Sequence, residues 1–100
     1  QVILNLLTNA LHATPEGGTI TLATGRQGGR AVIEVRDTGC GIPPENLPKV
    51  FDPFFTTKEP GKGTGLGLSL SHGIVARLGG NLTAQSAVGK GSVFTVSLPL

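Results

Sequence analysis

The fold is decided by residues 65–80, which read GLGLSLSHGIVARLGG. Apolar side chains recur there at the spacing of one helical face, at Leu66, Leu70, Ile74 and Leu78. The pair Gly79-Gly80 then supplies a stop signal. We therefore expect a helix over residues 65–78. This helix separates two groups of strands.

Segments of alternating or β-branched character lie on both sides of this helix. They predict strands at residues 19–24, 31–36, 81–86 and 92–98. The first two form a hairpin around a turn at 25–30, and the last two form a hairpin around 89–91. Another helix is expected at 1–14, a tight loop at 37–42, a helical turn at 43–50 and a loop at 51–63. This order predicts an α/β (α+β) two-layer sandwich, with a mixed β-sheet covered on one face by helices.

Bulk composition limits the function classes. One hundred residues make one small domain, and 16 of them are glycine, which suggests loops that approach a ligand closely. The net charge is +2 with the Lys and Arg scattered, so we expect no nucleic-acid surface. Cys40 is the only cysteine, which excludes an internal disulfide and a cysteine-based metal site.

The beginning of the chain lies inside an apolar helical run without a capping residue. We therefore expect residues 1–100 to be one N-terminally truncated domain of a longer protein. No apolar run approaches the roughly 20 residues that a bilayer crossing needs. A cytoplasmic location is expected, with any membrane contact made through missing parts of the parent protein.

The first helix carries a polar stripe on an otherwise apolar cylinder. At about 100° per residue, one sector of about 100° holds Gln1, Asn5, Thr8, Asn9 and His12. This stripe is either the solvent face of the helix or a binding surface. In the second interpretation, Asn5 and Asn9 lie one turn apart and offer amide oxygens to Mg²⁺, a cation that prefers oxygen ligands.

Asp37 ends a strand and opens the loop Gly39-Cys40-Gly41. Its carboxylate is suited to accept a hydrogen bond from the 6-amino group of adenine. Guanine places a carbonyl oxygen there, and an unpaired buried acceptor costs roughly 1–3 kcal/mol. The alternative is that Asp37 only caps the turn, as Asp before Gly often does.

A glycine-rich run, residues 61–67, precedes the second helix and is suited to bind phosphate through backbone N–H groups. Two familiar phosphate motifs do not fit this run. A Walker A loop needs Gly where Thr56 stands, and a dinucleotide-binding motif needs Gly where Leu68 stands.

Four segments in this order resemble the N, G1, F and G2 boxes of histidine kinase catalytic domains. They are Asn5-x-x-x-Asn9-Ala10, Asp37-x-Gly39-x-Gly41, Phe51-Asp52-Pro53-Phe54-Phe55 and Gly63-Thr64-Gly65-Leu66-Gly67. The resemblance covers essentially the whole chain, and residues 51–58 look like the nitrogen-regulation-type subgroup. The wider superfamily also contains gyrase, the heat-shock chaperone ATPase and the mismatch-repair ATPase.

The resemblance implies cofactors, a lid and site residues. Asn9 would bind Mg²⁺ directly with Asn5 assisting, Asp37 would bind the adenine of ATP, and Gly39 and Gly41 would shape its pocket. Residues 52–64 would form a flexible ATP lid anchored by Phe54 and Phe55. Further ATP contacts are implied for His12, which stands where the family often has Lys, and for Ile42, Lys58, Lys62, Gly63, Thr64, Gly65, Leu66, Gly67, Leu68 and Ser92.

The implied function is transfer of the γ-phosphoryl group of ATP to a histidine on a separate dimerisation domain of the same kinase, with a response regulator as an indirect partner. Two alternatives stay open. An ATPase of the chaperone or gyrase type would carry Glu where this chain has Asn5, because an amide cannot take a proton from water. A non-catalytic nucleotide-binding module would bind ATP without transferring phosphate.

Overall fold

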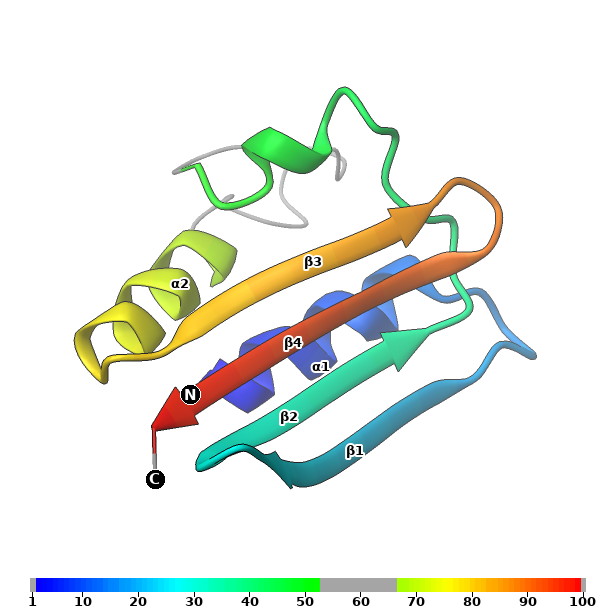
Figure 1. Ribbon diagram of the computed structural model, residues 1–100. Helices are drawn as coiled ribbons and strands as arrows, with labels where there is room; N and C mark the ends of the chain where they lie inside the picture. Colours follow the sequence, from blue (N-terminus) through cyan, green and yellow to red (C-terminus); the bar gives the residue numbers. More distant parts are fainter. Residues whose placement is uncertain (1, 53–66, 100) are drawn as a thin grey trace.

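The computed structural model describes residues 2–52 and 67–99. Its elements follow the order that the sequence pattern predicts: helix, two strands, short helix, helix, two strands (Figure 1). They are α1 (Val2–Ala13), β1 (Ile20–Gln27), β2 (Arg30–Asp37), the 3-10 helix η1 (Leu47–Lys49), α2 (Gly67–Arg77), β3 (Asn81–Ala87) and β4 (Gly91–Pro99).

The four strands form one sheet in the order β1-β2-β4-β3. Every pairing among the described residues is antiparallel, so the expectation of a mixed sheet is wrong for this part of the chain. Each hairpin is antiparallel by construction, and the second hairpin places β4 rather than β3 beside β2. The strands β2 and β3 run in the same direction, but β4 separates them.

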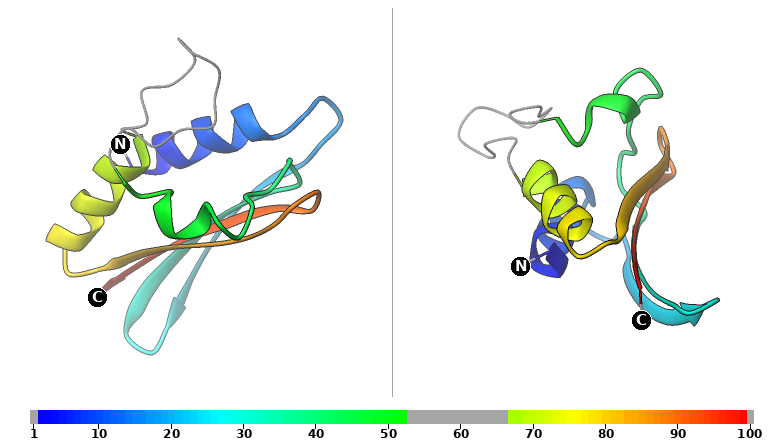
Figure 2. Two further views of the ribbon diagram at one scale, coloured as in Figure 1. Left: turned by 90° about the horizontal axis from the view of Figure 1, so that it is seen from above. Right: turned by 60° about the vertical axis from the view of Figure 1, so that its left-hand side comes forward.

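Both helices cover the same face of this sheet, and the described chain leaves the other face bare (Figure 2). The predicted two-layer α+β architecture is confirmed. The two layers meet in a core whose buried apolar residues come from both helices and from three strands. These residues are Leu6, Ala10, Val35, Val75, Leu82, Phe94 and Val96.

The first hairpin is longer than predicted. The segment Gly25–Gln27, assigned to the turn by the sequence, continues β1 and pairs with residues 30–32 of β2. The turn consists of Gly28 and Gly29, whose φ angles are 51° and 80°. Two residues with positive φ match the right-handed twist of a hairpin, so this turn needs no more than the two glycines.

The buried face of α2 also differs from the apolar stripe in the sequence. Leu70 and Leu78 are 55% and 59% exposed, whereas Ser71 and Val75 are 0% and 1% exposed. The helix therefore turns Ser71 rather than Leu70 towards the rest of the protein. This serine becomes part of the site described below.

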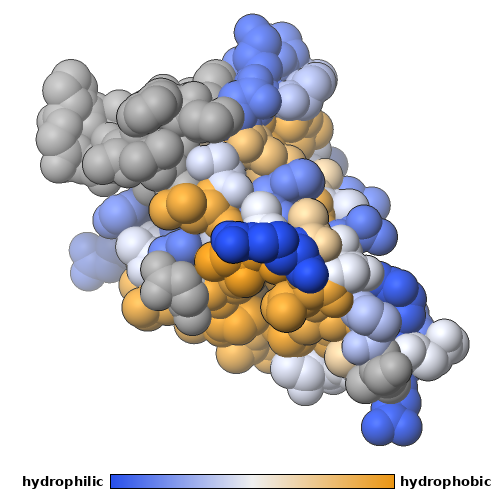
Figure 3. Space-filling view, turned by 90° about the vertical axis from the view of Figure 1, so that its left-hand side faces the viewer, coloured by the Kyte–Doolittle hydropathy of each residue, from blue (hydrophilic) through white to orange (hydrophobic). Residues whose placement is uncertain are grey.

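Six large apolar side chains of the described chain are at least half exposed: Leu4, Leu11, Leu22, Leu70, Leu78 and Val88. Figure 3 shows apolar side chains gathered on the end of the molecule where α2 lies and α1 begins. Small domains bury a smaller share of their apolar surface than large ones. No helix in the described ranges has the length and apolar character of a membrane-spanning segment.

Candidate functional site

The register of the sheet places three polar residues side by side at one end. Asp37 of β2 pairs with Ser92 of β4, and Ser92 pairs with Ser86 of β3. The next row on the same face is Val35, Phe94 and Ala84, which belongs to the apolar core or packs against it. The helix-facing side of the sheet therefore changes from apolar to polar at its last row.

Asp37 is held rigidly at this end, with only 4% of its surface exposed. Its Oδ1 accepts hydrogen bonds from the backbone N–H of Gly39 at 2.9 Å and of Ser92 at 3.3 Å. The bond to Gly39 closes the turn, as the capping interpretation predicted. Within residues 2–52 and 67–99, no donor contacts the second carboxylate oxygen, Oδ2. One oxygen therefore holds the loop and the other is left as an acceptor.

The glycines that follow Asp37 let the loop pass close to two other backbones. A Cβ on Gly39 would collide with the carbonyl oxygen of Ala13 at the end of α1. Gly41 has φ 78°, and a Cβ there would collide with the carbonyl oxygen of Ala87 at the end of β3. The backbone N–H of Cys40 also bonds to the Ala13 carbonyl oxygen at 3.2 Å. The loop thus joins Asp37 to both α1 and the last strand pair.

The two asparagines of α1 lie on its inner polar edge. Asn5 and Asn9 are half-buried, whereas Thr8 and His12 are exposed. Asn5 donates a hydrogen bond from Nδ2 to Oγ of Ser71 on α2 at 3.1 Å. The stripe is therefore a solvent face only at its outer edge.

The position of Asn9 follows from its neighbours along the helix. It lies one turn after Asn5, which contacts α2, and one turn before Ala13, which contacts the Asp37 loop. The same helix thus connects the amide pair to both other parts of the predicted site. In the described ranges no cluster of three His, Cys, Asp or Glu side chains is placed to hold a metal. The asparagine pair offers amide oxygens, which Mg²⁺ accepts as ligands.

Four further residues with predicted ATP contacts are described by the structure. His12 lies exposed in the last turn of α1. Ile42 and Leu68 are half-buried and pack against the core, and the backbone N–H of Ile42 bonds to Oγ of Ser86 at 2.7 Å. Ser92 is 5% exposed and belongs to the polar row. The roles of these residues towards ATP stay predictions.

The rest of the predicted site lies outside the described residues. This part comprises the lid beyond Asp52 and the residues Phe54, Lys58, Lys62, Gly63, Thr64, Gly65 and Leu66. Gly67, the last of the glycine run, is the first residue of α2.

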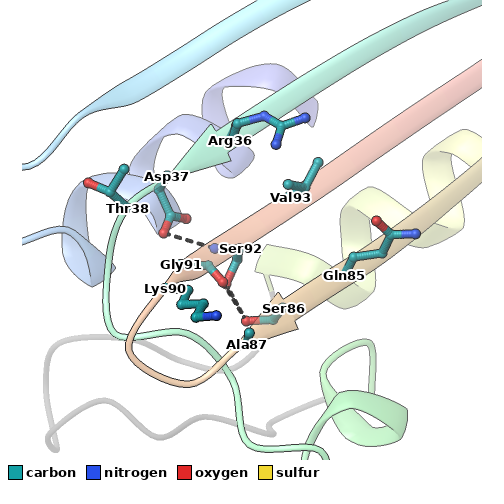
Figure 4. A pocket seen from close by; sticks show the side chains of 10 residues that line it. All are labelled: Arg36, Asp37, Thr38, Gln85, Ser86, Ala87, Lys90, Gly91, Ser92 and Val93. Atoms are coloured by element: carbon teal, nitrogen blue, oxygen red, sulfur yellow. Dashed lines mark hydrogen bonds between the residues drawn. The ribbon is translucent and has the colours of Figure 1, made fainter.

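A shallow cavity of about 360 Å³ opens at the same end of the sheet (Figure 4). It extends from the row of polar residues formed by Asp37, Ser92 and Ser86 to the helix-free face of the sheet. The adjacent row of Arg36, Val93 and Gln85 has its side chains on that helix-free face. Its lining is Arg36, Asp37, Thr38, Gln85, Ser86, Ala87, Lys90, Gly91, Ser92 and Val93. The cavity reaches Asp37 from the side opposite the helices.

Sequence reasoning missed two serines of this region. Ser71 is fully buried against Asn5, and Ser86 contacts both the Asp37 loop and Ser92. Ser86 and Ser92 flank a turn with Gly89 and Gly91, so a hairpin register would have brought them together. No comparable signal marks Ser71, because a serine between Leu70 and His72 has no pattern that predicts burial.

Comparisons with known proteins agree with this arrangement. The chain matches, over residues 1–100, the family model of the histidine kinase-, DNA gyrase B-, and HSP90-like ATPases. Sensor kinase CckA of Brucella abortus is 48% identical over 114 residues, which cover 99% of this chain and 12% of that protein. The chain thus spans about an eighth of the length of this curated relative.

Two solved structures extend the comparison to the fold. The catalytic domain of histidine kinase ThkA superimposes with a TM-score of 0.86 at 38% identity, covering 99% of this chain and 64% of that one. Full-length ShkA in complex with AMPPNP superimposes with a TM-score of 0.87 at 31% identity, covering 98% of this chain and 20% of that one. The arrangement of α1, α2 and the four-stranded sheet is therefore one found in histidine kinase catalytic domains.

Proposed function

Because the chain belongs to the family of histidine kinase-, DNA gyrase B- and HSP90-like ATPases, we propose that it binds Mg²⁺–ATP and transfers the γ-phosphoryl group to a histidine in two-component signalling. The acceptor histidine lies on a separate dimerisation domain of the same kinase, and a response regulator receives the phosphate afterwards. The named relatives support this proposal, since CckA is a sensor kinase and ThkA a histidine kinase.

One observation carries the proposal: α1 contacts α2 through Asn5 and the Asp37 loop through Ala13. A nucleotide bound along this helix would have its base at Asp37 and its phosphates towards the beginning of α2. Helix N-termini attract phosphate, and α2 begins at Gly67, the last residue of the glycine-rich run. The AMPPNP complex of ShkA supports a triphosphate ligand for this fold.

Each described residue then has a defined task. Asp37 accepts a hydrogen bond from the adenine 6-amino group through the oxygen that does not hold the loop. Asn9 binds Mg²⁺ through its amide oxygen and Asn5 assists. The bound Mg²⁺ neutralises charge on the phosphates. The amides themselves are neutral, which suits a cation whose charge is already balanced by a triphosphate.

The chain supplies no acceptor of its own in this proposal. Its sequence contains no His-Glu acceptor motif, and the position that would activate water in an ATPase is Asn5. In the described structure Asn5 donates a hydrogen bond to Ser71, and its amide cannot take a proton from water. These residues are suited to phosphoryl transfer that depends on positioning of ATP and neutralisation of its charge.

The two alternatives make different predictions for one experiment. The chain is incubated with Mg²⁺ and γ-labelled ATP, alone and with a separate histidine-bearing dimerisation domain. A histidine kinase labels the added domain with acid-labile phosphate and releases little inorganic phosphate alone. Steady phosphate release by the chain alone would instead assign a gyrase-type or chaperone-type ATPase. Tight binding with neither product would assign a non-catalytic nucleotide-binding module.

We further assign the chain to the nitrogen-regulation-type subgroup and to the cytoplasm. The sequence Phe51-Asp52-Pro53-Phe54-Phe55 followed by Thr56-Thr57-Lys58 supports the subgroup. Phosphorylation of a purified response regulator of that class, and none of an unrelated class, tests this assignment. Fractionation of cells that express the parent protein, with antibody against this domain, tests the location.

A further inference from the structure

Ser86, near the end of β3, has three hydrogen-bond partners through one hydroxyl, one in the loop after Asp37 and two at the start of β4. Its Oγ accepts a hydrogen bond from the backbone N–H of Ile42 at 2.7 Å. It donates to the carbonyl oxygen of Gly91 at 2.9 Å. It also lies 2.8 Å from Oγ of Ser92, a contact in which either hydroxyl can donate (Figure 4).

Either hydroxyl can donate in the last contact, but only one direction satisfies all three contacts of Ser86 at once. A serine hydroxyl has one proton and two acceptor lone pairs. The carbonyl oxygen of Gly91 can only accept, so it takes the proton of Ser86. In this arrangement Ser92 donates its own proton to Ser86. The Ser92 oxygen is left with lone pairs only, in the same row as the carboxylate of Asp37.

We propose that Ser86 is a positioning residue that makes Ser92 a hydrogen-bond acceptor and so selects 6-amino purines over 6-oxo purines. This inference rests on the proposed function, because it needs the base of the nucleotide to lie at Asp37. Ser86 itself does not touch the base. It acts by accepting a hydrogen bond from the Ser92 hydroxyl, so that Ser92 cannot donate this proton to the base.

The selectivity follows from the chemistry of the two bases. Adenine presents an amino group, which donates, and both Asp37 and Ser92 accept. Hypoxanthine presents a carbonyl oxygen at the same position, which faces acceptors only and loses its hydrogen bonds on binding. If Ser86 becomes alanine, the Ser92 hydroxyl is free to rotate and to donate to that carbonyl oxygen.

The test measures dissociation constants of ATP and inosine triphosphate for the full chain by titration calorimetry. We expect Ser86→Ala to reduce the preference for ATP by about five- to tenfold, the worth of one hydrogen bond. In a Ser92→Ala background the same change should leave the preference unaltered. Thr83→Ala is the matched control, since Thr83 is exposed on the opposite face of β3 and does not line the cavity.

The alternative role for Ser86 is to anchor the loop through Ile42 only. In that case Ser86→Ala weakens the binding of ATP and of inosine triphosphate equally, both in the wild type and in the Ser92→Ala variant. This result overturns the proposal. If Ser86→Ala does not fold, Ser92→Ala alone decides: it must weaken ATP more than inosine triphosphate, and equal weakening rejects the proposal. If the wild-type chain binds neither nucleotide, the proposed function itself is overturned. If it binds ATP but shows no effect of Ser86 on selectivity, only the role of Ser86 is overturned.

Discussion

Asn5 on α1 and Ser71 on α2 are joined by a hydrogen bond of 3.1 Å, from the amide Nδ2 to a hydroxyl with no exposed surface. A primary amide has a donor end and an acceptor end, and this bond fixes which end faces α2. The contact therefore determines where the amide oxygen of Asn5 lies. If that oxygen assists a cation, Ser71 contributes to metal binding without touching the metal.

Replacing Ser71 by alanine should weaken nucleotide binding in a magnesium-dependent way. We expect several-fold weaker binding of ATP with Mg²⁺ and little change with EDTA, because the lost bond is worth about 0.5–1.5 kcal/mol. Adding Ser71→Ala to Asn5→Ala should have no further effect. Val75→Ala, one turn later in the same buried face, is the control for loss of stability alone. An equal loss with and without Mg²⁺ would reject the positioning role.

Asp37→Asn should abolish detectable ATP binding and leave the fold intact. The oxygen that accepts from Gly39 and Ser92 is retained in an amide, so the loop keeps its hydrogen bonds. The other end becomes an NH₂ group, which faces the adenine amino group donor to donor. Calorimetry measures the affinity and thermal unfolding measures the fold. Glu34→Gln, the same change on the outer face of β2, is the control, and near-normal affinity in Asp37→Asn would refute the adenine assignment.

The sequence predicted the order of elements and the helical layer, because apolar periodicity and glycine stops are local signals. The strand order was not accessible in that way. Nothing local states that β4 rather than β3 pairs with β2, and this pairing is what aligns Asp37 with Ser92. The hairpin turn predicted at 25–30 was too wide, because Gly25 looks like a turn residue but is paired within β1 and Arg30 is paired within β2.

The candidate site shows the same division between local and distant information. Asp37, Asn5 and Asn9 were found because each residue type matches a chemistry in a short motif. Ser71 and Ser86 were missed because their importance comes from partners 66 and 44 residues away in the sequence. A serine has no distinctive pattern of its own, so only the tertiary arrangement reveals it.

The ring of His72 on α2 stacks on Phe51, with centroids 4.9 Å apart and an interplanar angle of 30°. We expect the free energy of unfolding to show a coupling of about 0.5–1.5 kcal/mol between His72→Ala and Phe51→Leu in a double-mutant cycle. Urea unfolding of the wild type, both single variants and the double variant provides the four values. Pairing Phe51→Leu with Arg77→Ala, also exposed on α2, is the control cycle. Additive effects in the His72 cycle would mean that the stacking contributes nothing to stability.

Two glycine substitutions should separate close packing from backbone freedom. Gly39→Ala places a methyl group against the carbonyl oxygen of Ala13, so α1 must move away from the Asp37 loop. We expect a loss of about 1–3 kcal/mol in the free energy of unfolding and weaker ATP binding, because α1 also carries the asparagine pair. Gly25→Ala meets no atom within 4 Å in the middle of β1 and should be neutral or slightly stabilising. Urea unfolding and calorimetry on both variants test this difference. If Gly39→Ala binds ATP normally while losing stability, the contact between α1 and the loop supports the fold but does not set the geometry of the site.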